Sequence, residues 1–313
     1  MTTKLSDPIY NDEAAARAHF ERIRWPNGRV CPHCGVVDNS TELKGKTTRA
    51  GLYKCNAKEC RKPFSAIMGT VYEKSHVPLH KWLLATYLLC SSKKGISSVQ
   101  LQRMLGFGSY RTAWFVAHRI REAMKASGNE PAMGSGGTMV EADETFYGRV
   151  PGNSRMAIHN MNKIVSLVDR ATGRAASTVV IGSLSHASIG PILAKHMADE
   201  AVLMTDEAHH YKTIGTRYVA HHTVNHARGE YVQRGNTTIH SNTIEGFFSV
   251  FKKGMKGIYQ HCGSQHLARY LSEFDFRYSN REALGINDIM RTDRAVAGTV
   301  GRRLTYKKPH LAV

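Results

Sequence analysis

Apolar residues in the first 130 positions recur every three or four residues, which is the spacing of amphipathic helices. This pattern predicts a short helix over residues 11–24 and three further helices between residues 78 and 126. In the second region Gly106 can end the middle helix and Ser109 can cap the last one. The first part of the chain is therefore expected to be mainly helical.

Beyond residue 138 the pattern changes to the short apolar runs and alternating positions of strands. Strands are predicted over 138–146, 164–168, 175–181 and 201–206, and helices over 189–197 and 243–253. The glycine-rich segment 133–137 comes just before this change, so we place a domain boundary there. Strands interspersed with helices predict an α/β fold for the second part of the chain.

The chain carries 43 Lys and Arg against 25 Asp and Glu, a formal charge of +18 over 313 residues. This excess favours nucleic acid over a membrane surface as partner, with a surface charged for solubility as the alternative. It amounts to +11 in residues 1–130 and +7 in residues 131–313, so both parts are expected to contact one polyanion. No apolar run reaches the roughly 20 residues of a membrane span, and residues 1–12 lack a signal core. We therefore expect a soluble, cytoplasmic chain.

Four of the six cysteines form two closely spaced pairs: Cys31 and Cys34, then Cys55 and Cys60. Thiolates at these spacings close a tetrahedral zinc site, and a structural Zn²⁺ is predicted there. A pair of disulfides is the alternative, but nothing in the sequence indicates an oxidising compartment. The two remaining cysteines, Cys90 and Cys262, are expected to be small buried apolar residues.

Two of the predicted helices, joined by the turn at Gly106, fit a helix-turn-helix. Three arginines of the last helix are the predicted DNA contacts: Arg111, Arg119 and Arg121. A turn of this kind also joins helices in ordinary bundles, so a purely structural connection remains open.

Three acids occupy notable positions in a part of the chain where acids are sparse. Asp143 lies in the first predicted strand on the same face as Glu141, with Glu144 exposed on the opposite face. Asp206 ends the last predicted strand, and Glu245 lies on the last predicted helix. Carboxylates converging from such elements would hold two divalent ions about 4 Å apart, the arrangement for in-line attack on a phosphodiester. Oxygen ligands suit Mg²⁺ or Mn²⁺.

Each of these acids also has an ordinary structural role open to it. Asp143 could be a solvated edge group, Asp206 a helix cap, and Glu245 part of a charged helical stripe. Glu273 and Asp275 are the second choice for the helical acid, although their aromatic neighbours predict a packed helix. Phosphate contact, water positioning and surface placement remain open for a group of nearby histidines: His209, His210, His221, His222, His226 and His240.

Longer motifs connect these positions. They include Gly95-Ile96-Ser97-Ser98-Val99-Gln100-Leu101, Glu141-Ala142-Asp143-Glu144, Thr205-Asp206-Glu207, Asn242-Thr243-Ile244-Glu245-Gly246-Phe247-Phe248, and the segments 31–34, 113–121, 252–257 and 266–278. With these motifs, most of the chain resembles the bacterial insertion-sequence transposases of the ISXO type, relatives of the eukaryotic Merlin elements. Some members of that group carry Asn at the third acidic position, whereas this chain has Glu245.

The resemblance implies a ribonuclease-H-like core, a mixed sheet flanked by helices, with Asp143, Asp206 and Glu245 as its acidic triad. It also implies that Lys252 contacts terminal DNA, and we expect Lys253 and Lys256 to contact phosphates beside it. The resulting domain order is an N-terminal helix (1–28), a zinc ribbon (29–72), a helix-turn-helix region (73–130), a ribonuclease-H-like catalytic domain (131–290) and a basic C-terminal tail (291–313).

The activity implied is that of a DDE-type transposase, which binds the terminal inverted repeats of an insertion sequence and catalyses metal-dependent strand cleavage and strand transfer. Its partners would be the double-stranded DNA of the element ends and of the target, in the bacterial nucleoid. Pairing two ends implies a homo-oligomer. The alternatives are a non-catalytic DNA-binding regulator, which would not need the acids, and a structure-selective nuclease, which would cut without joining.

Overall fold

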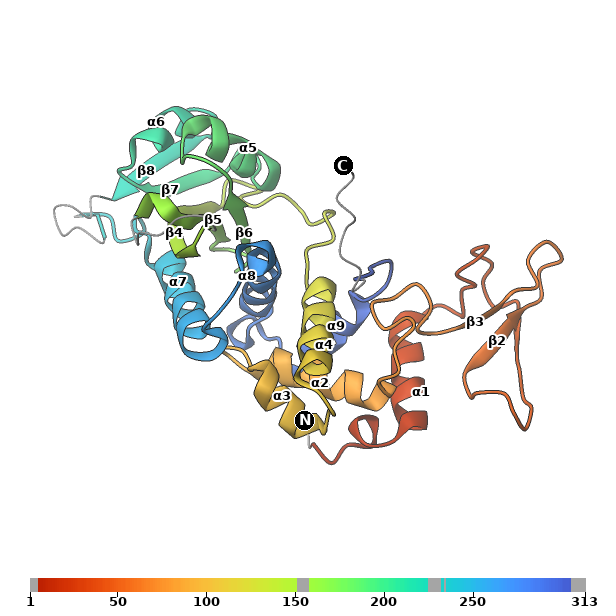
Figure 1. Cartoon of the computed structure of the whole chain (residues 1–313). Coiled ribbons are helices and arrows are strands. Elements are labelled where there is room, and N and C mark those ends of the chain that lie inside the picture. The colour runs from red at the N-terminus through yellow and green to blue at the C-terminus, as the bar shows by residue number, and fades with distance from the viewer. Residues whose placement is uncertain (1–4, 151–157, 225–231, 234, 305–313) are drawn as a thin grey trace, which may run out of the picture. The chain divides into compact units, whose positions relative to one another are not determined.

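The computed structural model describes residues 5–150, 158–224, 232–233 and 235–304, which fall into two compact units. The first unit comprises residues 1–92, 96–124 and 287–313, and the second comprises residues 93–95 and 125–286. In Figure 1 the first unit carries the labels α1 to α4 and α9, and the second carries the larger sheet. Within the described ranges, no helix is both long and apolar enough to cross a membrane.

The first unit begins with a 3-10 turn, Pro8–Tyr10, and helix α1 (Glu13–Arg24), close to the predicted range. Asp12 caps α1, because its Oδ1 accepts a hydrogen bond of 2.7 Å from the Ala15 amide. Three short antiparallel strands follow in the order β1 (Ser40–Glu42), β2 (Leu52–Cys55) and β3 (Pro63–Ser65). Tyr53 and Phe64 pack beside two of the cysteines in the small core of this ribbon.

Three helices confirm the helical expectation for residues 78–126: α2 (Leu79–Ser91), α3 (Ser98–Leu105) and α4 (Tyr110–Ala123). Gly106 ends α3 in the left-handed region at φ +60°, and the Ser109 hydroxyl accepts a hydrogen bond from the Thr112 amide at the start of α4. The sequence therefore identified the three helices and the turn between α3 and α4. That α3 and α4 act as a helix-turn-helix stays a prediction.

The predicted basic tail over 291–313 is wrong for its first part. Residues 288–297 form helix α9 (Asp288–Ala297), which belongs to the first unit. Ala295 and Val296 are buried, and the Arg291 guanidinium donates a hydrogen bond of 3.0 Å to the Cys90 carbonyl at the end of α2. The prediction of a tail considered the charge of this segment. The buried residues of α9 show instead that the helix packs in the first unit.

The second unit is built on a five-stranded sheet in the order β6-β5-β4-β7-β8. Its strands are β4 (Met139–Arg149), β5 (Met161–Asp169), β6 (Ala175–Val180), β7 (Val202–Asp206) and β8 (Ala220–Val224). β4, β5 and β6 pair antiparallel, whereas β4, β7 and β8 run parallel. The sheet is therefore mixed, and four of its strands match the predicted ones. β8 was not predicted because its sequence is mostly polar.

Helices cover both faces of this sheet (Figure 1). On one face α5 (His186–His196) and α6 (His209–Gly215) pack through Ile189 and Tyr211 against Ala142 and Leu203. On the other face α7 (Asn242–Gly254) and α8 (Ser264–Ser279) pack against Ile164. A single turn, Met255–Tyr259, follows α7; short turns also lie at Ile158–Asn160 and Glu282–Leu284. The expected α/β class with a mixed sheet is confirmed for this unit.

Candidate functional site

The register of two parallel strands places Asp143 and Asp206 opposite each other. Glu141 on β4 pairs with Met204 on β7. Asp143 and Asp206 each lie two residues further along, and residues two apart on a strand share a face. Asp206 is the last residue of β7, and its Oδ1 accepts a hydrogen bond of 3.0 Å from the Ala208 amide. The two acids therefore lie side by side where β7 ends.

Helix α7 brings the third predicted acid to the same face. The amide of Ile244, in the first turn of α7, donates a hydrogen bond of 2.8 Å to Oε2 of Glu141. Glu245 is the next residue, and its Oε1 accepts a hydrogen bond of 3.2 Å from the Ser241 hydroxyl. The start of α7 is thus attached to β4 only two residues from Asp143.

The pKa of Asp143 shows that the three carboxylates interact. The pKa of Asp143 is raised to about 7, chiefly by burial and in addition by the negative charges of Glu144, Asp206 and Glu245, against the opposing hydrogen bond from the Glu144 amide. Like charges held together in this way are what a bound divalent cation relieves. The donor set consists of carboxylate oxygens, so the residues present fit Mg²⁺ or Mn²⁺.

Glu144 differs from its prediction. It lies on the opposite face from Asp143 as expected, but its side chain is only 8% exposed and pairs with His210 on α6, with Nε2 and Oε1 2.6 Å apart. Burial raises the pKa of Glu144, and the nearby imidazole opposes that rise. Period-two alternation predicted the face correctly, but helix α6 covers it.

The second-choice acids of α8 have packing roles. Glu273 is buried, pairs with Arg277 one turn later, and accepts a hydrogen bond of 2.5 Å from the Tyr259 hydroxyl. Asp275 accepts two hydrogen bonds from Ser177 on β6, of 2.9 Å from the amide and 2.7 Å from the hydroxyl. Both contacts attach α8 to its neighbours, in agreement with the packed helix predicted from the sequence.

The flanking histidines divide by their surroundings. His209 and His222 are exposed, whereas His221 Nε2 lies 2.8 Å from the Thr205 hydroxyl. His210 pairs with Glu144, as described above, and His240 lies beside Arg170 just before α7. His226 lies outside the described residues.

The four cysteines of the ribbon form a closely spaced cluster. Their sulfur atoms all lie within 4.8 Å of one another, with Cys31 and Cys60 3.8 Å apart and Cys34 and Cys55 3.6 Å apart. Tetrahedral Zn²⁺ at a zinc–sulfur distance of about 2.3 Å requires sulfur separations of about 3.8 Å. Burial acts to raise the pKa of Cys31, but hydrogen bonds from the amides of His33 and Cys34 and from the thiols of Cys34 and Cys55 together lower it to about 7. This geometry fits a structural zinc ion.

The carboxylate site is more open than the cysteine cluster. Among the described residues, the cysteines are the one group of three or more possible ligands with all donor atoms within 4.8 Å. The oxygens of Asp143, Asp206 and Glu245 are thus farther apart than the sulfurs, as ligands shared between two ions can be. Of the other cysteines, Cys90 is buried as predicted, whereas Cys262 is only partly buried.

The predicted DNA contacts fall into two groups. Lys252, Lys253 and Lys256 are all exposed at the end of α7 and in the turn after it, and Arg111 is exposed on α4. Arg119 and Arg121, however, are 6% and 0% exposed, which conflicts with their expected role. Arg119 donates a hydrogen bond of 2.7 Å to the Glu73 carbonyl. Helical spacing alone did not show that these two arginines face the interior.

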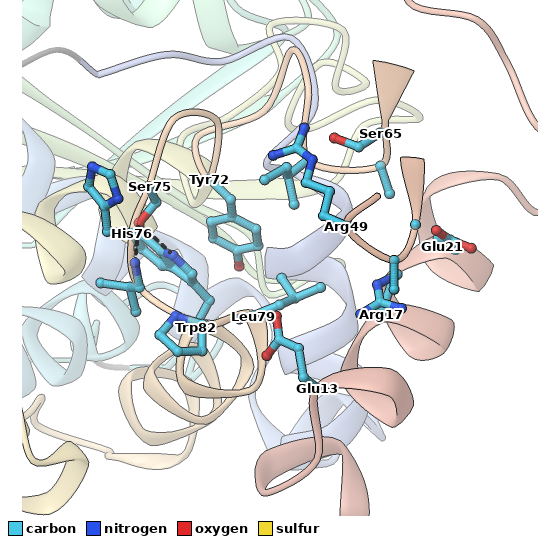
Figure 2. A pocket seen from close by; sticks show the side chains of 16 residues that line it. Glu13, Arg17, Glu21, Arg49, Ser65, Tyr72, Ser75, His76, Leu79 and Trp82 are labelled. Atoms are coloured by element: carbon cyan, nitrogen blue, oxygen red, sulfur yellow. Dashed lines mark hydrogen bonds between the residues drawn. The ribbon is translucent and has the colours of Figure 1, made fainter. Parts of the chain in front are cut away.

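A pocket of about 360 Å³ in the first unit lies between α1, the ribbon and the start of α2 (Figure 2). Its acids already serve the fold. Glu13 accepts hydrogen bonds from the Leu79 and His80 amides and so caps α2, and Glu21 accepts one from the Tyr53 hydroxyl. This pocket therefore does not compete with the carboxylates of the second unit as a candidate active site.

Sequence comparisons agree with the separation of the ribbon from the unit that contains the five-stranded sheet. Residues 135–279 match the model of the ISXO2-like transposase domain, and residues 11–63 match that of the transposase zinc-ribbon domain. The chain is also 26% identical over 296 residues to an uncharacterized protein in transposable element ISH50 of Halobacterium salinarum, covering 87% of this chain and 94% of that protein. Ribbon and sheet thus define a zinc-ribbon protein with an α/β transposase domain. Residues 135–279 thus resemble an ISXO2-like transposase domain, and residues 11–63 a transposase zinc ribbon.

Proposed function

We propose that this transposase cuts the ends of its element and joins them to target DNA at a two-metal centre formed by Asp143, Asp206 and Glu245. The observation that carries the proposal is the position of these three acids on β4, β7 and α7 of a transposase domain. The register of β4 and β7, and the hydrogen bond from the Ile244 amide to Glu141, bring them to one face of the sheet. We also assign this unit to the ribonuclease-H-like fold, on its mixed sheet with helices on both faces.

The chain's own residues would bind and orient the reacting groups. Bound Mg²⁺ or Mn²⁺ supplies activation of a water or 3′ hydroxyl and stabilises the leaving oxygen. Asp143 would have to release its proton to hold an ion, because its pKa is raised to about 7 in the free protein and the carboxyl is partly protonated at neutral pH. Ser241 holds one oxygen of Glu245 and so limits the orientations of that carboxylate. No protein nucleophile is required.

DNA recognition would use both units. The ribbon with its structural Zn²⁺ and helices α3 and α4, including Arg111, would recognise the terminal inverted repeats. Lys252, Lys253 and Lys256 would contact phosphates near the cleavage site, and their exposure supports this role. The net charge of +18 supplies the attraction to DNA. Because two ends must be paired, we propose that the active form is a homo-oligomer.

One assay tests the whole proposal. The full chain is incubated with Mg²⁺, a labelled duplex carrying the element's own terminus, and a supercoiled target. We expect a joined product that Asp206→Asn abolishes, whereas Glu200→Gln, a change of an exposed acid in the same unit, leaves it in place. A cut product without joining would identify a nuclease, and binding without cutting would identify a regulator. Either result would overturn the proposal.

A further inference from the structure

We propose that Glu141 and Arg170 act together as positioning residues that fix helix α7, and with it Glu245, relative to Asp143. The inference rests on the proposed function, since it concerns the third acid of that site. Glu141 is fully buried, on the same face of β4 as Asp143 and two residues before it. A carboxylate so buried requires strong partners.

Both oxygens of Glu141 have such partners. Oε1 accepts a hydrogen bond of 2.5 Å from Arg170 Nε, and Oε2 accepts one of 2.8 Å from the Ile244 amide. His240 Nδ1 lies 3.4 Å from Oε1. A carboxylate engaged in this way is held in one orientation, and its contacts serve the chain itself rather than an ion.

Arg170 extends the attachment to the segment that leads into α7. It directly follows β5, and its Nη1 donates a hydrogen bond of 2.5 Å to the Thr238 carbonyl. Its Nη2 donates one of 2.6 Å to the His240 carbonyl and lies 2.9 Å from His240 Nδ1. The planar guanidinium thereby joins β4, the end of β5 and residues 238–240.

The attachment contributes to the start of α7, where a local side chain also takes part: His240 Nδ1 accepts a hydrogen bond of 3.3 Å from the Asn242 amide. Ser241 is the N-cap residue, and its side chain makes no capping hydrogen bond to the helix backbone. Glu141 instead accepts the amide of Ile244 in the first turn, as a capping side chain would, although it belongs to a strand 103 residues earlier. Its negative charge also suits the N-terminal end of the helix dipole. Glu141 thus helps to fix the first turn of the helix.

This arrangement has a consequence for the active site. Asp143 and Glu141 share one strand face, while Glu245 directly follows Ile244, so the attachment sets the distance between two of the three acids. If the attachment is lost, we expect the start of α7 to shift while the sheet remains folded. A displacement of about 1 Å in a catalytic group can cost about 10²-fold in rate.

The test compares Glu141→Gln, Arg170→Lys and the double variant with the wild-type full chain. In Glu141→Gln we expect single-turnover cleavage at saturating Mg²⁺ to fall by about 10²-fold, with unchanged affinity for the element end. Amide hydrogen exchange over residues 242–248 should accelerate. Arg170→Lys should retain part of the activity, and the double variant should be no slower than Glu141→Gln, because both changes disrupt the same attachment.

Asp199→Asn is the matched control. Asp199 also accepts a hydrogen bond from an arginine Nε, that of Arg217 at 2.7 Å, but this pair is exposed and away from α7. We expect it to leave both cleavage and exchange in α7 unchanged. Wild-type rate and unchanged exchange in Glu141→Gln would overturn the inference. Loss of cleavage with unchanged α7 exchange and lost Mn²⁺ binding would also overturn it, by making Glu141 a ligand.

The exchange measurement separates this inference from the proposed function. A wild-type chain that does not cut DNA would refute the proposed function, yet exchange in α7 would still report whether Glu141 fixes the helix. Unchanged exchange in an active chain would refute the positioning role alone.

Discussion

The two candidate metal sites of this protein are built in opposite ways. In the ribbon, four sulfurs lie within 4.8 Å of one another beside a small core in which Tyr53 and Phe64 are the buried residues other than cysteine. In the second unit, the acids stand on a sheet covered by helices on both faces, and Glu141 and Arg170 fasten the helix that carries Glu245. We therefore expect the ribbon to need a zinc ion for folding, and the sheet to fold before any ion binds.

Loss of the ribbon's metal is expected to have the largest effect. Cys55→Ser should release zinc and unfold residues 40–65, because structural zinc contributes about 10–16 kcal/mol in zinc-finger peptides. Zinc content and amide hydrogen exchange measure this effect. Exchange in the sheet of the second unit should not change, and Cys262→Ser, outside the cluster, should retain zinc. A ribbon that stays protected without zinc would contradict the comparison.

Loss of an acid should have the converse effect, removing chemistry while keeping the fold. Asp143→Asn, Asp206→Asn or Glu245→Gln should lower cleavage by about 10³-fold or more, since the charge that holds the ions is lost. In the absence of divalent ions, the melting temperature of each variant should equal or exceed that of the wild type, because one of several repelling charges is gone. Single-turnover cleavage and thermal melting check this. A large fall in melting temperature would show that the acids serve the fold.

The same contrast explains what the sequence could predict. The cysteine pairs are separated by two and four residues, so their spacing alone indicated the site. Asp143, Asp206 and Glu245 were placed from the elements that carry them. The attachment of Glu141 could not be predicted, because its partners lie 29 and 103 residues away and are joined only by the tertiary fold.

Burial was the other quantity that local patterns did not give. Arg119 was predicted to contact DNA because it is basic, yet its side chain is buried and donates a hydrogen bond to the Glu73 carbonyl. Glu144 was assigned to the correct face, but the helix that covers it, with His210, comes 66 residues later. A buried acid or arginine requires a partner of opposite charge or a hydrogen-bonding group. The sequence alone does not show which residue that partner is.

The lysines at the end of α7 and in the turn after it allow a smaller test, of the proposed DNA contacts near the acids. Changing Lys252, Lys253 or Lys256 to Ala should weaken binding of all DNA sequences alike and reduce the slope of log affinity against log salt by about 1 per lysine. Titrations at several salt concentrations measure this. Lys195→Ala, an exposed lysine on α5, is the control. Loss of sequence preference with an unchanged slope would contradict a phosphate contact.

The smallest expected effect concerns Asp275, an acid whose pKa is raised like that of Asp143 but which lies outside the candidate site. Burial raises the pKa of Asp275 to about 7, against the hydrogen bonds from Ser177. Between about pH 4 and 7 the folded state then keeps a proton that the unfolded state releases, so stability falls as pH rises. Asp275→Asn should remove this part of the fall, which is about 1.4 kcal/mol for each pH unit over which the folded state alone keeps the proton.

Urea unfolding of Asp275→Asn and the wild type at pH 4, 5.5 and 7.5 measures the difference. The advantage of the variant should grow with pH, while cleavage in Mg²⁺ remains. Parallel pH profiles would show that Asp275 is not the group responsible. The expected result would distinguish a carboxyl group whose pKa is raised by packing alone from one that binds an ion.

Helix α9 makes the completion of the first unit depend on the last part of the chain to be synthesised. It is encoded after the whole second unit, yet it packs in the first unit, where Arg291 bonds to Cys90 and His19 lies 2.9 Å from Asp293. The first unit thus cannot complete its core while the chain is still emerging from the ribosome. Prematurely terminated products lack this helix, so they would make poor competitors of the intact protein for the element ends.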